Sequence, residues 1–212
     1  MVGQRKRVGE KYLSTKKKLL YILCYFPIAA YGNSLVIKAA IGQGSFLALQ
    51  VALSNWLGIN VGTIYVILSA FLFFFCFLLD RQKKWSDYLL MLVAIFSFGW
   101  LTNFFVYGLF GNLNLDNYLF KLGYFLLGLV IMGMGLGKLL KDELVTFPLE
   151  KVCLLSSKQT TWSFTRYRYL SDIFCISLAL FVSLLKATEF SIREGTFLSM
   201  LLLPGLLAFF KK

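Results

Sequence analysis

Six long apolar runs alternate with short polar or basic segments along the chain. They cover residues 19–37, 61–79, 88–110, 118–137, 169–185 and 197–210. An α-helix of about 20 apolar residues spans the hydrocarbon core of a bilayer, so each run is a candidate transmembrane helix. The sixth run is the shortest and contains Pro204 and Gly205. The pattern predicts an all-α membrane protein with about six transmembrane helices.

The composition supports the same class of protein. The chain has 212 residues, of which 58% are hydrophobic and 15% charged, and its mean hydropathy is +0.73. A typical soluble domain is about 45–50% apolar and about 25% charged, and a fold of this size cannot hide so much apolar surface from water. The composition therefore excludes an ordinary soluble domain, a disordered chain and a disulfide-stapled secreted module, and it makes the lipid bilayer the first predicted partner.

Basic residues set the predicted orientation. The formal net charge is +12, and with six spans and a cytoplasmic N-terminus eighteen lysines and arginines lie inside and four outside. Basic residues collect on the cytoplasmic side of membrane proteins, so this charge is attributed to topology and no nucleic-acid partner is expected. We expect a multi-pass protein of the cytoplasmic (inner) membrane with both termini in the cytoplasm. Residues 1–18 form a basic cytoplasmic leader.

Two shorter segments do not fit the pattern of spans. Residues 42–57 and 144–156 are moderately apolar but carry polar or charged side chains such as Gln50 and Glu150. Helices of this length lie at the membrane interface or re-enter the membrane beside a cavity. The sequence leaves both interpretations open for each segment.

The same order of elements occurs twice. Residues 19–110 and 118–212 each read as a long helix, a short polar helix, a long helix, a short loop and a long helix, and residues 111–117 form the outer loop between them. A repeat with three crossings begins its second copy on the opposite side of the membrane. The sequence therefore predicts two inverted three-helix repeats, each with an extra short interfacial or re-entrant helix. Inverted repeats with interrupted helices are typical of transporters.

Several short motifs carry a family resemblance. The first half has IGQGSF at residues 41–46 and NVGT at residues 60–63, and the second half has Arg168 four residues before Asp172 and a Gly-Thr pair at residues 195–196. With these motifs the chain resembles the YczE/YyaS/YitT-type bacterial integral membrane proteins. It departs from them at residues 45–46, where Ser-Phe replaces Pro-Trp, and at residues 143–146, where a glycine-rich turn is usual. The resemblance implies about six spans in the cytoplasmic membrane and no particular substrate.

Polar residues within or beside the spans are the candidate substrate-binding residues. A charge inside the membrane usually faces protein or water, so such residues point to a polar cavity between the repeats. The candidates are Asn33, Lys38, Gln43, Gln50, Arg168 and Asp172. Purely structural roles are an alternative for the charged residues and for the glutamines. Arg168 and Asp172, spaced i, i+4, can form an ion pair that anchors a helix start, Lys38 can extend to the headgroups, and the glutamines can belong to a polar helix face.

No pattern of catalytic residues is present in the sequence. The chain has no histidine, its four cysteines are scattered, and it has no phosphate-binding loop, so we expect neither an enzyme nor a bound cofactor or metal. The leading hypothesis is a transporter or exporter of an unidentified small solute. The alternatives are a non-transporting accessory membrane protein of a secretion or biosynthesis pathway and a substrate-capture subunit of a vitamin transporter. Either could act with a partner membrane protein or as a homo-oligomer.

Overall fold

The structure, a computed structural model, describes residues 15–80, 83–113, 115–141, 147–185 and 192–211. These residues form helices and no strand, which confirms the predicted all-α class. The helices are α1 (Thr15–Ala39), α2 (Ser45–Leu57), α3 (Val61–Leu79), α4 (Trp85–Asn103), the π-helical segment η1 (Phe104–Leu109), α5 (Tyr118–Lys141), α6 (Pro148–Gln159), α7 (Phe164–Leu185) and α8 (Glu194–Lys211). Most of the predicted leader (1–14), Asn114 of the outer loop and the second-half turn (143–146) lie outside the described residues.

Four helical segments in the described part of the chain are long and apolar enough to cross a membrane. They are Val61–Leu79, Trp85–Leu109, Tyr118–Leu139 and Phe164–Leu185. The first and sixth predicted spans, in α1 and α8, are not among them, and the apolar part of α8, Glu194–Phe210, is shorter than the four. Helix α8 nevertheless continues unbroken through Pro204 and Gly205. The structure thus supports a membrane protein, and the count of six spans stays a prediction.

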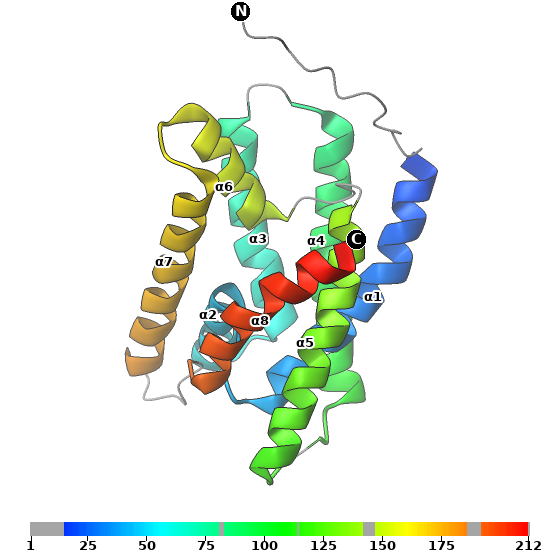
Figure 1. Cartoon of the computed structure of the whole chain (residues 1–212), viewed down its shortest axis with the longest axis vertical. Helices are drawn as coiled ribbons and strands as arrows, with labels where there is room; N and C mark the ends of the chain where they lie inside the picture. Colours follow the sequence, from blue (N-terminus) through cyan, green and yellow to red (C-terminus); the bar gives the residue numbers. More distant parts are fainter. Residues whose placement is uncertain (1–14, 81–82, 114, 142–146, 186–191, 212) are drawn as a thin grey trace, which may run out of the picture.

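Glycines allow α1 and α5 to cross in close contact, on the side of the bundle that also holds α4 (Figure 1). A Cβ atom on Gly32 of α1 would lie 2.4 Å from the Met132 backbone nitrogen, and one on Gly135 of α5 would lie 2.6 Å from the Ala29 nitrogen. Another face of α5 carries Gly133, where a Cβ atom would lie 2.9 Å from Cβ of Leu206 in α8. Small residues let helix backbones approach this closely, so α5 holds α1 and α8 on two faces.

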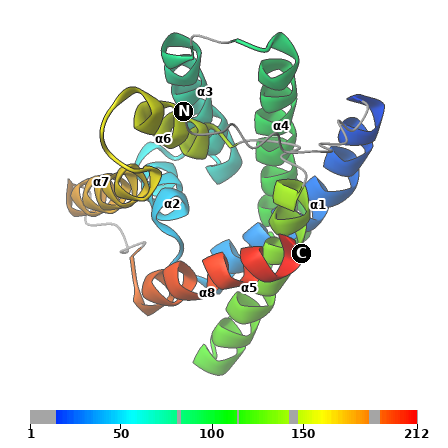
Figure 2. The ribbon, with the colours of Figure 1, turned by 45° about the horizontal axis from the view of Figure 1, so that its top comes forward.

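The two short helices occupy different positions in the bundle (Figure 2). Helix α2 packs against α3 and α7, and its residues Ala48, Leu49 and Ala52 are buried. Helix α6 packs against α3 and α7 at the end of the molecule where α3 ends and α7 begins. Both predicted short segments are therefore helical, and α2 lies within the bundle and not on its surface.

Contacts at the two ends of the bundle show where two of the predicted loops lie. At one end, Lys38 at the end of α1 donates to the Gly111 carbonyl at 3.4 Å, and the Tyr118 hydroxyl at the start of α5 donates to Glu194 of α8 at 3.1 Å. At the other end, Gln159 of α6 donates to the Leu79 carbonyl of α3 at 2.6 Å. The predicted outer loop and the predicted cytoplasmic loop thus lie at opposite ends.

Replacement of Gly135 by leucine tests the α1–α5 crossing. We expect Gly135→Leu to lower the midpoint of thermal unfolding by about 3–10 °C, because overpacking a close contact costs about 1–3 kcal/mol. Intrinsic tryptophan fluorescence of the purified protein in detergent gives this midpoint. The matched control is Gly123→Leu in the same helix, where a Cβ atom meets no atom within 4 Å. Equal stability of the two variants would contradict the role of the glycine.

Candidate functional site

A cavity of about 180 Å³ lies at the centre of the bundle, and all eight helices contribute to its wall. Most of the wall is apolar, with residues such as Val36 of α1, Leu129 and Met132 of α5 and Leu203 of α8. The polar residues of the wall are Asn33, Ser45, Gln50, Ser69, Glu150, Arg168 and Ser199. The cavity is therefore an apolar chamber with a few polar groups, which is the usual composition of a small-molecule site.

The turn before α2 fixes one edge of the cavity. Gly42 has φ +116°, and a Cβ atom there would lie 2.7 Å from the Thr196 nitrogen, so only glycine suits both the backbone conformation and the contact. The Ile41 carbonyl accepts from the Gly195 amide at 2.8 Å, and the Thr196 hydroxyl accepts from the Gln43 amide at 3.2 Å. These bonds join the turn to the start of α8 and so position Ser45 and Gln50 at the cavity.

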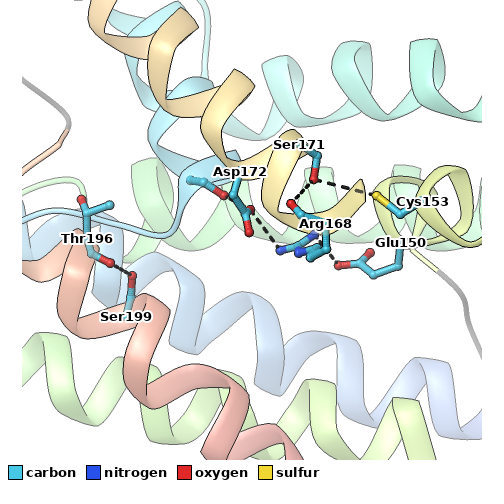
Figure 3. A network of polar contacts seen from close by, with 8 residues as sticks. Glu150, Cys153, Arg168, Ser171, Asp172, Thr196 and Ser199 are labelled. Atoms are coloured by element: carbon cyan, nitrogen blue, oxygen red, sulfur yellow. Dashed lines mark hydrogen bonds and ion pairs between the residues drawn. The ribbon is translucent and has the colours of Figure 1, made fainter. Parts of the chain in front are cut away.

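Three charged side chains form an ionic triad beside the cavity (Figure 3). Arg168 of α7 donates to Glu150 of α6 through Nη1 at 3.1 Å, and its Nη2 lies 3.5 Å from Oδ1 of Asp172. The Ser45 hydroxyl of α2 donates to the same Asp172 carboxylate. One guanidinium therefore connects two helices of the second half, and Asp172 extends the connection to the first half.

Local structure favours these positions. Pro148 begins α6 and Glu150 lies in its first turn, where the helix dipole stabilises a negative charge. Arg168 and Asp172 lie one turn apart on α7, and so face the same side. Burial raises the pKa of the Glu150 carboxyl above its ordinary value, although the nearby Arg168 guanidinium opposes this effect.

A second ion pair holds α6 from its other side. Lys151 lies 3.8 Å from the Asp80 carboxylate of α3, and its ammonium lies 3.7 Å from the ring centroid of Tyr88 in α4. The Tyr88 hydroxyl donates to Asp80 at 2.8 Å. Adjacent residues of α6 thus point to different partners, Glu150 to α7 and Lys151 to α3 and α4.

Comparison with known protein families shows to which family the chain belongs. The model of a family of unknown function, DUF6198, matches residues 15–212. The chain belongs to this family. It is also 30% identical over 138 residues to the uncharacterized protein YyaS of Bacillus subtilis (strain 168), a match that covers 65% of this chain and 67% of YyaS. No solved structure gives a significant match. The resemblance to YyaS-type proteins inferred from the sequence is thereby confirmed.

In this DUF6198 protein, the structure brings four of the six candidate residues together. Asn33, Gln50 and Arg168 line the cavity, and Asp172 contacts Arg168 directly behind its wall. The other two lie elsewhere. Gln43 is buried beside the turn, with its side-chain oxygen unpartnered among the described residues, and Lys38 contacts Gly111 at the end of the bundle. The placement of Lys38 agrees with the alternative that its side chain extends away from any central site.

The two amides in the cavity wall have unused hydrogen-bonding capacity. Asn33 is 5% exposed and Gln50 is 3% exposed. Within the described part of the chain neither side chain makes a hydrogen bond, although a buried amide normally has partners. Both amides are therefore free to bind water or a polar ligand in the cavity.

The sequence did not indicate two residues that complete the site. Glu150 was one charged residue in a short, moderately apolar segment, and no pattern in the sequence paired it with Arg168. Thr196 belonged to a Gly-Thr motif of the family resemblance, and nothing in the sequence paired it with a residue 153 positions away. Among the described residues there is no group of three or more His, Cys, Asp and Glu side chains that could hold a metal.

Removal of Arg168 tests the ionic triad. We expect Arg168→Ala to lower the free energy of unfolding by about 1–3 kcal/mol, because two partly buried carboxylates lose their counter-ion. The loss is greater at pH 8 than at pH 5. Without the guanidinium the pKa of Glu150 rises further above its ordinary 4.5, so the fold favours the protonated carboxyl and loses stability as the pH rises.

Thermal unfolding of the purified protein at the two pH values measures this effect. Arg166→Ala is the matched control, since Arg166 is an exposed arginine of the same helix. The triad has no structural role if the two variants are equally stable at both pH values.

Proposed function

We propose that this protein transports or exports a small solute across the bacterial cytoplasmic membrane through the central cavity. The observation that carries the proposal is that all eight α-helices of the described residues line one mainly apolar cavity, and that two buried amides in its wall have no hydrogen-bond partner among those residues. A protein with only a scaffolding role gains nothing from such a cavity, since an unfilled interior loses packing energy and buried amides without partners are destabilising. A solute with an apolar body can fill the cavity, and its polar groups can bind the two amides.

An inverted repeat is part of the proposal, with α1–α4 as the first half and α5–α8 as the second. The pairs of packed helices support it. If each helix of the first half is matched to the helix four places later in the second half, most packed pairs correspond to another packed pair. The α1–α4 contact corresponds to α5–α8, α2–α7 to α6–α3, and α2–α3 to α6–α7, while α1–α5 corresponds to itself. The exception is that α3 packs against α4, whereas α7 and α8 scarcely touch in the described residues.

In this proposal the short helices α2 and α6 act as two gates, called the covers of the cavity below. Residues 44–47 and 50 place α2 at the wall, and residues 148–150 place α6 there. The triad joins both covers to α7, through Ser45 and Asp172 on one side and Glu150 on the other. Movement of either cover breaks one link and leaves the other, so the cavity opens to one side at a time. Alternating exposure of one central site is the mechanism that inverted repeats permit.

The proposed topology has six crossings and both termini in the cytoplasm. The eighteen-to-four distribution of basic residues supports it, as does the grouping of loop contacts at opposite ends of the bundle. In this orientation α6 covers the cytoplasmic side of the cavity. The start of α8 and the end of α1 lie toward the outside.

Chemical modification of a cysteine in the cavity tests the transport proposal. Asn33→Cys is introduced into a chain with Cys24→Ala, which removes the exposed native cysteine and retains the three buried ones. We expect a membrane-impermeant cationic methanethiosulfonate to modify this residue both in right-side-out and in inside-out vesicles, because a transporter exposes its site to each side in turn. Mass spectrometry of the purified protein measures the modified fraction.

Three further cysteines serve as controls. Lys84→Cys and Asn117→Cys, both at exposed positions, report the inner and outer faces, and each should react from one side only. Ala94→Cys, buried in α4 away from the cavity wall, should stay unmodified. Modification of Asn33→Cys from neither side would favour the accessory role over transport, and modification from the outside alone would favour a capture subunit.

A further inference from the structure

The charges around the cavity are not balanced. Arg168 contributes one positive charge, and Glu150 and Asp172 contribute two negative charges. Arg168 is therefore already engaged by two carboxylates, so an incoming anion would compete with both for one guanidinium. An incoming cation would instead complete the charge balance of the triad.

Glu150 is the carboxylate that a ligand can reach. It lines the cavity, whereas Asp172 does not, and its side chain remains 37% exposed although Arg168 contacts one of its oxygens. The Asp172 side chain is 13% exposed, accepts a hydrogen bond from Ser45 and forms an ion pair with Arg168. The negative charge available inside the cavity thus lies on Glu150.

Aromatic rings form much of the rest of the wall. Phe46, Tyr65, Phe98 and Phe147 all line the cavity. The Tyr65 ring centroid lies 5.1 Å from that of Phe98 and 6.4 Å from that of Phe46, so three of the rings form a continuous group. The faces of aromatic rings attract organic cations, most strongly where water is excluded.

The amides and the volume restrict the ligand further. The side-chain oxygens of Asn33 and Gln50 can accept hydrogen bonds from an N–H donor, since neither amide has a partner among the described residues. The cavity of about 180 Å³ is slightly larger than an apolar cavity of about 150 Å³ that binds benzene. It therefore has room for one ring with a short side arm.

We infer that the cavity binds a small organic cation, a protonated amine on a ring-sized apolar body, with its ammonium group at Glu150 and the two amides. The inference rests on the proposed function in using the same cavity. It adds the chemical class of the solute, which the transport proposal leaves open.

Isothermal titration of the purified protein in detergent at pH 7 tests the inference with three probes of similar size. Benzylammonium is cationic, benzyl alcohol neutral and benzoate anionic. We expect benzylammonium to bind at least about 10-fold more tightly than benzyl alcohol, and benzoate not to bind, because only the cation gains from the carboxylate and the rings.

Variants locate the binding within the cavity. Glu150→Gln should weaken benzylammonium binding at least about 10-fold and leave benzyl alcohol unaffected, whereas Glu194→Gln, at an exposed carboxylate outside the cavity wall, should change neither. Ser199→Leu, which fills part of the cavity, should weaken both probes. Size-exclusion chromatography and unfolding curves verify that each variant is folded.

The other outcomes have distinct meanings. Equal or tighter binding of benzyl alcohol or benzoate, or an unchanged affinity in Glu150→Gln, overturns the cation class while the cavity remains a ligand site. Absence of binding by all three probes also overturns the inference. The cysteine modification described above tests transport without any assumption about the class of the solute, so the two failures are distinguishable.

Discussion

The guanidinium of Arg168 lines the cavity of an apolar bundle, where its side chain is only 34% exposed, and its charge has to be compensated there. Two carboxylates provide the compensation, one from α6 and one from its own helix. Since an unpaired charge in an apolar surrounding is far less favourable than a paired one, α6 is held against α7, and Asp172 in turn holds the first residue of α2. This requirement thus helps to fix both short helices, and with them two walls of the cavity, together with the bonds of the turn before α2 and the Lys151–Asp80 pair of α6.

Close packing of α1 and α5 is the second determinant of the site. Glycines at the crossing let the two helices meet without side chains between them. Asn33 and Val36 of α1 and Leu129 and Met132 of α5 therefore face the same cavity. In the proposed inverted repeat, the α1–α5 crossing is the contact that corresponds to itself when the two halves are exchanged.

Some of this arrangement could be predicted from the sequence and some could not, and the difference between the two parts has physical causes. Apolar runs predicted the long helices because transfer into lipid depends on local composition, and the spacing of Arg168 and Asp172 predicted a shared face because the helix period is fixed. Burial of α2 could not be predicted, since its mixture of polar and apolar residues suits both an interface and a cavity wall. The partnership of Arg168 with Glu150 depends on tertiary contact across 18 residues. Lys38 was a candidate because it is a charged residue beside a predicted span, but its side chain donates to the Gly111 carbonyl at the end of the bundle.

The site combines features that are unfavourable for a purely structural protein. It keeps an unfilled volume, two amides without partners and an excess negative charge in one region. Each feature becomes favourable when a small cation with an apolar body is present. The close crossing of α1 and α5, together with the ion pairs of α6, supplies the stability that offsets these losses while the cavity is empty.

The most direct measurement is solute counterflow in proteoliposomes. Vesicles containing the purified protein are loaded with unlabelled benzylammonium and placed in a trace of the labelled compound, so exchange is detected whatever ion couples transport. The account predicts rapid accumulation of label in vesicles with the unmodified protein, above the level in protein-free vesicles and in vesicles with the cavity-filling variant Ser199→Leu. Equal accumulation in all three kinds of vesicle would contradict it.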